Sequence, residues 1–251
     1  MILKIIRNTL TYPIIIQFLQ KILGANIYTK LPFGLNPILD IKYIFPNYKL
    51  ENYFDVGSNI GQTENKIFNF LTKEKIYCFE PIKDTYLQLL KNIKGKNTES
   101  FNIAFGENNT FLDLKINNSN KTSPANSLSS NNQNIKENYT IEKIEVRSLD
   151  SFMSEKNIGK ISFLKIDAEG YEDKILSGAH ENLKNSNIDF IELEVGLNPF
   201  NNHHIEFEKV KKILESYDYY LFGLYEQVHD FMLKKQILRR CNAVFISNKI
   251  A

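Results

Sequence analysis

The chain carries the sequence NYFDVGSNIGQ at residues 52–62, and the rest of the predicted fold is arranged around it. Its apolar run ends abruptly at Gly57, and helix-permissive residues resume at Gln62. This pattern predicts a strand, a tight turn and a helix in succession. Because Gly57 and Gly61 lack a Cβ, the turn can adopt positive φ and approach a ligand closely, and the first amides of the helix would point at the same space.

A second apolar run, Lys75–Phe79, ends at Glu80. Glu80 lies roughly twenty residues after the turn, where doubly wound folds place a carboxylate that binds a ribose. Pro81 then ends the strand because it has no backbone donor. The spacing of the turn, DxGxNxG, is neither the GxGxxG of dinucleotide dehydrogenases nor a phosphate-binding P-loop. Turn and carboxylate together predict a site for a ligand that contains a ribose.

Strand and helix patterns alternate after this point, which predicts a parallel sheet with right-handed crossovers. We expect helices at 62–71 and 83–94, further strands at 102–106, 110–116, 141–147, 161–167 and 189–195, and an antiparallel closing pair at 219–225 and 242–247.

Three acidic residues, Asp167, Glu169 and Glu172, lie within six residues at the end of the strand predicted at 161–167. Doubly wound sheets bind ligands at this carboxyl edge. We interpret Glu172 as stabilising the positive end of the next helix, and the same reading is open for Glu169. Asp167 lies on the edge itself and is a candidate functional residue, as is Glu194 at the end of the next strand.

Two histidines, His203 and His204, follow this edge in a loop. A neutral imidazole is available near neutral pH as a base for an alcohol. Neighbouring residues point in different directions, so at most one of the two is expected to act. The alternative is that both are solvated loop residues.

Six stretches carry a family resemblance: DVGSNIGQ, CFEP, NIAFGEN, VRSLDSF, FLKIDAEGYEDKILSGA and IELEV. In this order they resemble the motifs of the FkbM family of S-adenosylmethionine-dependent methyltransferases, from about Asn52 to Val195 and more loosely to Ile246. The resemblance implies an α/β fold of the class I methyltransferase type, Rossmann-like, with a mostly parallel seven-stranded sheet, helices on both faces and an antiparallel C-terminal strand pair.

The resemblance also implies which residues bind S-adenosylmethionine. They are Asp55, Gly57, Ser58, Asn59, Gly61, Glu80, Pro81, Asn102, Ala104 and Asp167. An amide at Asn102 could recognise the adenine ring, or it could satisfy a turn. Both readings remain open.

The function expected from the resemblance is methyl transfer to a hydroxyl of a sugar, nucleotide-linked or part of a bacterial surface polysaccharide precursor such as capsule or lipopolysaccharide. Candidates for removing the hydroxyl proton are Asp167, Glu194, His203 and His204. Asp167 and Glu194 could instead hold a divalent metal such as Mg²⁺, although we favour a metal-free reaction. The alternatives are an NAD-dependent oxidoreductase and a non-catalytic module that binds S-adenosylmethionine.

Composition is consistent with one catalytic domain at 51–251, preceded by a helical or irregular extension at 1–50. The net charge of +2 argues against a nucleic acid partner. Cys78 and Cys241 are expected to be reduced, packed thiols, which favours the cytoplasm.

Two segments remain outside this pattern. Residues 2–23 are apolar but interrupted by charges and Pro13, so we expect neither a membrane span nor a signal peptide there. They are expected to form helices that pack on the domain or on a second subunit, or alternatively lie on a membrane surface. Residues 117–138 are rich in Asn, Ser and Lys, which predicts a long mobile loop. Our hypothesis is that this loop closes over bound substrate.

Overall fold

The structure is a computed structural model and describes residues 21, 33–63, 74–93, 97–117, 139–201, 204–230 and 236–251. The chain divides into two compact units, Met1–Leu35 and Asn36–Ala251. The second unit contains every strand named below and also the helix α3 (Pro37–Ile44), which lies inside the extension expected at 1–50. The segment expected at 2–23, most of the helix expected at 62–71 and most of the loop expected at 117–138 lie outside the described residues.

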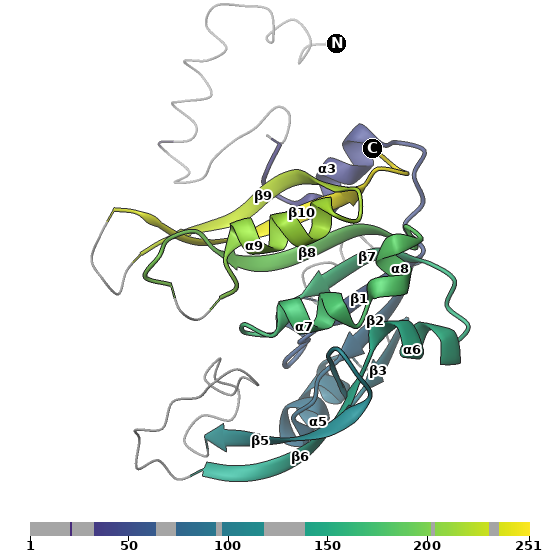
Figure 1. The fold of residues 1–251 in the computed structure, drawn as a ribbon, viewed down its shortest axis with the longest axis vertical. Helices are drawn as coiled ribbons and strands as arrows, with labels where there is room; N and C mark the ends of the chain where they lie inside the picture. Colours follow the sequence, from purple (N-terminus) through teal and green to yellow (C-terminus); the bar gives the residue numbers. More distant parts are fainter. Residues whose placement is uncertain are drawn as a thin grey trace, which may run out of the picture. The chain divides into compact units, whose positions relative to one another are not determined.

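A seven-stranded sheet organises the second unit, with the order β3-β2-β1-β7-β8-β10-β9 (Figure 1). Its strands are β1 (Asn52–Val56), β2 (Lys75–Phe79), β3 (Thr98–Phe101), β7 (Ile161–Ile166), β8 (Ile188–Gly196), β9 (Tyr219–His229) and β10 (Leu238–Ser247). The first five in the order pair in parallel, whereas β10 pairs antiparallel with both β8 and β9. The expected antiparallel pair at the C-terminal end is therefore confirmed.

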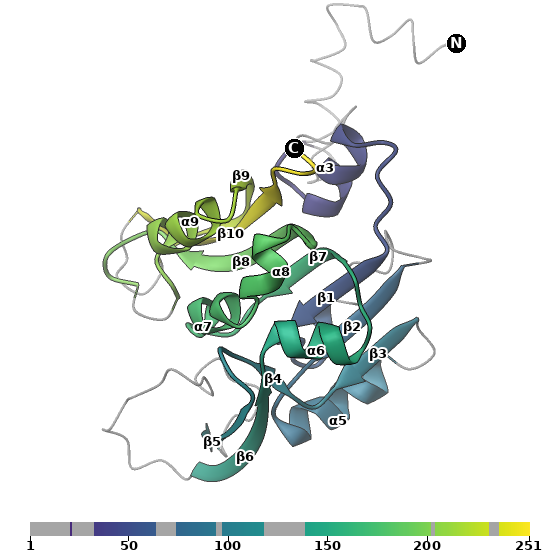
Figure 2. The same cartoon turned by 45° about the vertical axis from the view of Figure 1, so that its right-hand side comes forward.

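Helices cover both faces of this sheet (Figure 2). They are α3, α5 (Lys83–Asn92), α6 (Leu149–Glu155), α7 (Glu172–Ser177), α8 (His180–Lys184) and α9 (Phe207–Glu215). On one face, Phe152 of α6, Ile175 of α7 and Val210 of α9 pack into the larger apolar cluster. On the other face, Ile41 of α3 and Leu89 of α5 pack into a second cluster. This layering confirms the predicted class I methyltransferase fold.

The third strand differs from the prediction. The apolar pattern predicts it at 102–106, but β3 is Thr98–Phe101, and β4 (Ala104–Phe105) belongs to a separate three-stranded sheet. That sheet has the order β4-β6-β5, with β5 at Thr110–Asn117 and β6 at Tyr139–Arg147. The edge strand β3 is only partly buried, so it lacks the apolar run that marks the central strands.

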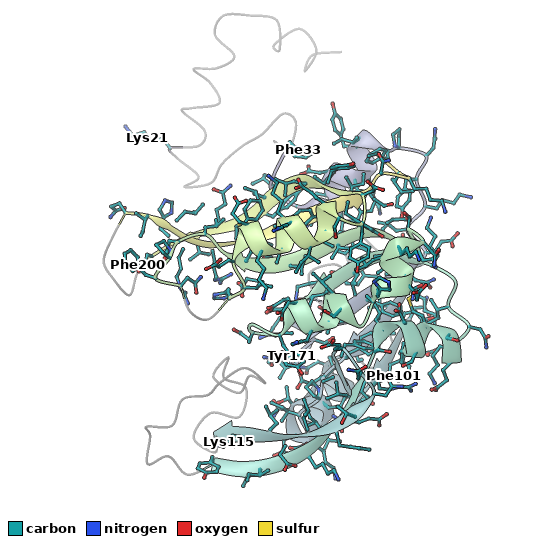
Figure 3. All side chains as sticks on the ribbon, in the orientation of Figure 1. Lys21, Phe33, Phe101, Lys115, Tyr171 and Phe200 are labelled. Atoms are coloured by element: carbon teal, nitrogen blue, oxygen red, sulfur yellow. The ribbon has the colours of Figure 1, made fainter. Side chains whose placement is uncertain are left out.

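Aromatic contacts join the two sheets. Phe101, labelled in Figure 3, ends β3, and its ring stacks on Phe79 with the centroids 5.5 Å apart. Phe79 also contacts Phe105 of β4 edge-on at 4.6 Å. This packing places the small sheet beside the carboxyl ends of β1 and β2, where the turn at Gly57 lies.

No helix among the described residues is long and apolar enough to cross a membrane. Cys78 and Cys241 are both buried, as expected for packed thiols.

Candidate active site

The turn after β1 is fixed to the neighbouring strand. Gly57 and Gly61 adopt φ values of 83° and 88°, as the sequence predicts for a turn that needs glycine. The amides of Gly57 and Ser58 both donate to the carbonyl of Phe79 at 3.0 Å. The Ser58 hydroxyl donates to the carbonyl of Asp55 at 2.7 Å and accepts from the amide of Phe79 at 3.1 Å. These bonds hold the turn at one place above the sheet.

Glu80 is fixed against the same turn. One carboxylate oxygen accepts from the amide of Ile82 at 2.9 Å, and the other accepts from the amide of Asn59 at 3.1 Å. Burial raises the pKa of the Glu80 carboxyl to about 7, against the opposing effect of these two bonds. Each oxygen keeps further acceptor capacity for a hydroxyl.

A cavity of about 340 Å³ opens beside the turn and Glu80, across the carboxyl ends of the sheet strands. On the side of the small sheet its walls are apolar, and they include Ile82, Ile103, Ala104, Phe105 and Leu114. On the side of β7, β8 and β10 its walls are charged, and they include Lys165, Asp167, Glu169, Glu194 and Arg240. The cavity therefore joins an apolar half and a charged half, with Glu80 and the glycine turn between them.

Lys165 connects two acids that come from different motifs, Asp55 and Asp167. Its ammonium lies 3.2 Å from Asp55 Oδ1 and 3.3 Å from Asp167 Oδ2. Burial lowers the pKa of Lys165, but the carboxylates of Asp55, Asp167 and Glu192 more than offset this and hold its pKa above the usual value. Lys165 therefore stays charged within the cavity wall.

Glu192 lies beneath this charged half, where Asn242 donates to its carboxylate at 2.8 Å. Burial raises the pKa of the Glu192 carboxyl from 4.5 to about 7, although the charge of Lys165 opposes the shift. A folded-state pKa above the unfolded one means that the protonated form stabilises the fold. This contribution is complete below pH 4.5 and is lost as the pH rises through about 7.

We therefore expect Glu192→Gln to flatten the dependence of Tm on pH. Between pH 5 and pH 8 the raised pKa corresponds to about 2–3 kcal/mol of lost stability in the wild type. Its Tm should therefore fall by about 5–10 °C more than that of the variant, because 1 kcal/mol shifts Tm by about 2–4 °C in a chain of this size. Thermal melts at both pH values check this. Glu181→Gln is the matched control, because the Glu181 side chain is 64% exposed. Parallel curves for wild type and Glu192→Gln would refute the expectation.

Glu194 is held from two sides. Its Oε2 lies 2.8 Å from His204 Nε2, and the guanidinium of Arg240 donates to its Oε1. The other ring nitrogen of His204 lies 3.0 Å from Asn201 Oδ1. His204 is not among the residues that line the cavity. His204 therefore lies behind Glu194 and orients it. His203, the other histidine predicted as a candidate base, lies outside the described residues.

Glu169 is a cavity residue that the sequence analysis did not select. It has a left-handed backbone, φ 50°, which is uncommon for a residue other than glycine and often marks functional sites. Burial, and next the charge of Asp167, raise the pKa of the Glu169 carboxyl to about 7. In the sequence, the signal that indicates a functional role for Glu169 is its position two residues after Asp167, at the sheet edge that binds ligands.

Most of the predicted cofactor residues come together in the cavity wall. Those that line it are Gly57, Ser58, Asn59, Glu80, Pro81, Ala104 and Asp167. Asp55 and Gly61 lie behind the wall and support the turn and Lys165. The side-chain amide of Asn102 donates to the backbone carbonyls of Glu80 and Pro81 at 2.8 and 2.7 Å. This supports the reading that Asn102 satisfies the hydrogen bonds of a turn.

A metal ion is a second possibility for the charged half. Glu169, Glu194 and His204 offer ligand atoms that all lie within 4.8 Å of one another. A divalent cation there would have to displace or accommodate Arg240, whose guanidinium already balances the charge of Glu194. The arrangement therefore fits removal of a hydroxyl proton by a carboxylate better than metal binding.

Comparison with known proteins agrees with these motifs. The model of the FkbM methyltransferase domain matches residues 55–221. A relative, hexuronic acid methyltransferase AglP of Haloferax volcanii, is 28% identical over 146 residues, which are 58% of this chain and 57% of AglP. The chain thus spans little more than half the length of this relative.

Among solved structures, magnesium protoporphyrin IX methyltransferase of Synechocystis PCC 6803 with bound SAM has a TM-score of 0.45 at 8% identity, covering 84% of this chain and 77% of that one. TrmK of M. capricolum with S-adenosylhomocysteine has a TM-score of 0.44 at 12% identity, covering 87% and 69%. Because the family model matches more than half of the 251 residues, this chain belongs to the FkbM methyltransferase family, with S-adenosylmethionine as the methyl donor that its motifs imply.

Proposed function

We propose that this chain is an S-adenosylmethionine-dependent O-methyltransferase that acts on a sugar hydroxyl. The acceptor would be a nucleotide-linked sugar or a precursor of a bacterial surface polysaccharide. One observation carries the proposal: a single cavity joins an apolar half beside Glu80 to a charged half that contains Glu169, a carboxyl with a pKa of about 7. The name of the relative AglP, a hexuronic acid methyltransferase, supports a sugar as the acceptor.

The apolar half fits an adenosyl group. Ile82, Ala104 and Leu114 offer apolar surface to an adenine ring, and Glu80 offers oxygens to the hydroxyls of a ribose. Ser58 and Asn59 line the cavity from a turn that Gly57 and Gly61 allow, and their amides hold this turn to Phe79 and Glu80. When bound, S-adenosylmethionine supplies an electrophilic methyl group on a positively charged sulfur.

The charged half fits the acceptor. A sugar hydroxyl is a weak nucleophile, so a base must take its proton as the new bond forms. Glu169 meets the requirement for such a base because its pKa lies near neutral pH, so a large fraction is ionised at pH 7. Glu194 is held by Arg240 and His204, and it would orient the acceptor by accepting a hydrogen bond from a second hydroxyl. Positioning by these fixed groups lowers the barrier further.

Two measurements test the proposal. Calorimetry should show binding of S-adenosylhomocysteine and no binding of NAD, which separates this function from the oxidoreductase alternative. The protein should then transfer label from methyl-labelled S-adenosylmethionine to a member of a panel of nucleotide sugars and free uronic acids, with an O-methyl signal in the NMR spectrum of the product. Binding without transfer to any sugar would favour the non-catalytic module.

The proposal also includes the cellular compartment and the kind of acceptor. A nucleotide-linked sugar as acceptor and the burial of both cysteines as packed thiols support the cytoplasm as its compartment. The near-neutral charge of the chain gives no support for a nucleic acid acceptor.

A further inference from the structure

A row of charged residues crosses the centre of the main sheet. Lys165 of β7 is in register with Asp55 of β1 on one side and with Glu192 of β8 on the other. All three belong to the buried part of the structure, at 9%, 0% and 7% exposure. The same row continues as Cys78 in β2 and Val244 in β10. Within the described strands, the charged members of this row are the neighbours Asp55, Lys165 and Glu192, and Lys165 also lines the charged half of the cavity.

A buried row of charges is a costly way to stabilise a sheet. Taking a lysine and two carboxylates out of water costs free energy that their attraction only partly returns, and apolar side chains of similar size are often equally stabilising. One oxygen of Asp55, Oδ2, is buried without a hydrogen-bond partner, which adds to the cost. A buried charged group that is costly to the fold and lies in a cavity wall indicates a functional role.

The position of Lys165 indicates what that role is. Its ammonium lies between Asp55, which is fully buried and fixed, and Asp167, whose side chain is 38% exposed in the cavity wall. Asp167 directly follows β7, and its carboxylate would otherwise be free to rotate towards solvent. The contact at 3.3 Å between Lys165 Nζ and Asp167 Oδ2 ties this exposed carboxylate to a fixed point in the core.

We propose that Lys165 is a positioning residue that holds the Asp167 carboxylate where the amino-acid end of the methyl donor binds. That end carries an ammonium and a carboxylate. The oxygens of Asp167 accept hydrogen bonds from the ammonium, and the positive charge of Lys165 attracts the carboxylate. This inference rests on the proposed function, since it assumes the adenosyl donor.

Lys165→Met tests the inference because methionine keeps the unbranched shape and most of the length of the side chain without the charge. Two probes are titrated by calorimetry: S-adenosylhomocysteine, and 5′-methylthioadenosine, which lacks the amino-acid end. We expect the affinity for S-adenosylhomocysteine to fall about 10- to 100-fold, the range of a hydrogen bond to a charged group, and the affinity for methylthioadenosine to stay unchanged. An equal loss for both probes, or for neither, would overturn the inference.

A second variant covers the risk that Lys165→Met does not fold, because Asp55 would lose its partner. Asp55→Asn combined with Lys165→Met removes both members of the buried pair and should restore Tm towards the wild type. The double variant should still bind S-adenosylhomocysteine weakly. Wild-type affinity in the double variant would mean that Lys165 only neutralises Asp55, and would refute the positioning role.

The action through Asp167 is tested by a double-mutant cycle. Asp167→Asn should weaken binding of S-adenosylhomocysteine but not of methylthioadenosine. Adding Lys165→Met to the Asp167→Asn variant should then cause little further loss of affinity. Fully additive losses would contradict the role of Lys165. Lys160→Met is the matched control, since Lys160 pairs with Asp189 at 2.8 Å and does not line the cavity. If the wild type bound neither probe, the proposed function would fail, a result distinct from any of these.

Discussion

Gly57→Ala is expected to abolish binding of S-adenosylhomocysteine and to destabilise the fold. Gly57 has φ 83°, where a Cβ is unfavourable, and an added Cβ would lie 2.0 Å from the backbone oxygen of Asp167. The turn after β1 and the end of β7 would have to separate. The left-handed backbone costs about 1–2 kcal/mol and the overpacking about 1–3 kcal/mol, so Tm should fall by about 4–20 °C in a chain of this size.

Thermal melts and calorimetry check this expectation. Gly159→Ala is the matched control, because an added Cβ there would meet nothing within 4 Å. It should leave both Tm and affinity unchanged. If Gly57→Ala keeps wild-type affinity for S-adenosylhomocysteine, the turn is not the cofactor-binding element that its sequence predicts.

The turn and the central strands could be predicted because their signals are local. Asn52–Val56 and Lys75–Phe79 are short apolar runs ended by glycine or proline, and the structure has strands with these bounds. The third strand could not be predicted in this way. Thr98–Phe101 is a partly exposed edge strand, whereas the apolar pair Ala104–Phe105 is buried in the small sheet. Apolar character reports burial, and burial does not say in which sheet a residue lies.

The charged half of the site shows the same limit. Asp167 and Glu194 were found because they end predicted strands at the edge that binds ligands. Lys165 and Arg240 were missed, because their roles come from pairing with residues 110 and 46 positions away. Such pairs follow from strand order and register, which the sequence pattern leaves open.

Histidine is one of the predicted candidates for the base because of its ordinary pKa, beside Asp167 and Glu194, and the geometry leads us to propose Glu169 instead. His204 lies behind Glu194 rather than in the cavity wall, whereas burial brings the carboxyl of Glu169 to a pKa of about 7. Burial can therefore give a carboxyl group the near-neutral pKa that an imidazole has without any shift.

Glu169→Gln is accordingly expected to lower kcat by about 10²–10⁴-fold, the usual contribution of a general base. Glutamine keeps the size of the side chain and should leave the affinity for S-adenosylhomocysteine unchanged. In the wild type, kcat should rise with pH through about 7, because only the ionised form of Glu169 accepts the proton. The residual activity of the variant should lack this rise. Methyl transfer measured from pH 5.5 to pH 9 with the identified sugar checks both effects.

Because the pKa values of Glu80 and Glu192 also lie near 7, the pH profile of the wild type alone does not identify the base, and a comparison of Glu169→Gln with His204→Gln is needed. His204→Gln should reduce kcat less than Glu169→Gln and should keep the rise with pH, since His204 acts only by orienting Glu194. A flat profile in His204→Gln with a rise preserved in Glu169→Gln would make the histidine the base. Loss of wild-type activity on chelation, restored by Mg²⁺, would instead assign Glu169, Glu194 and His204 to a metal ion.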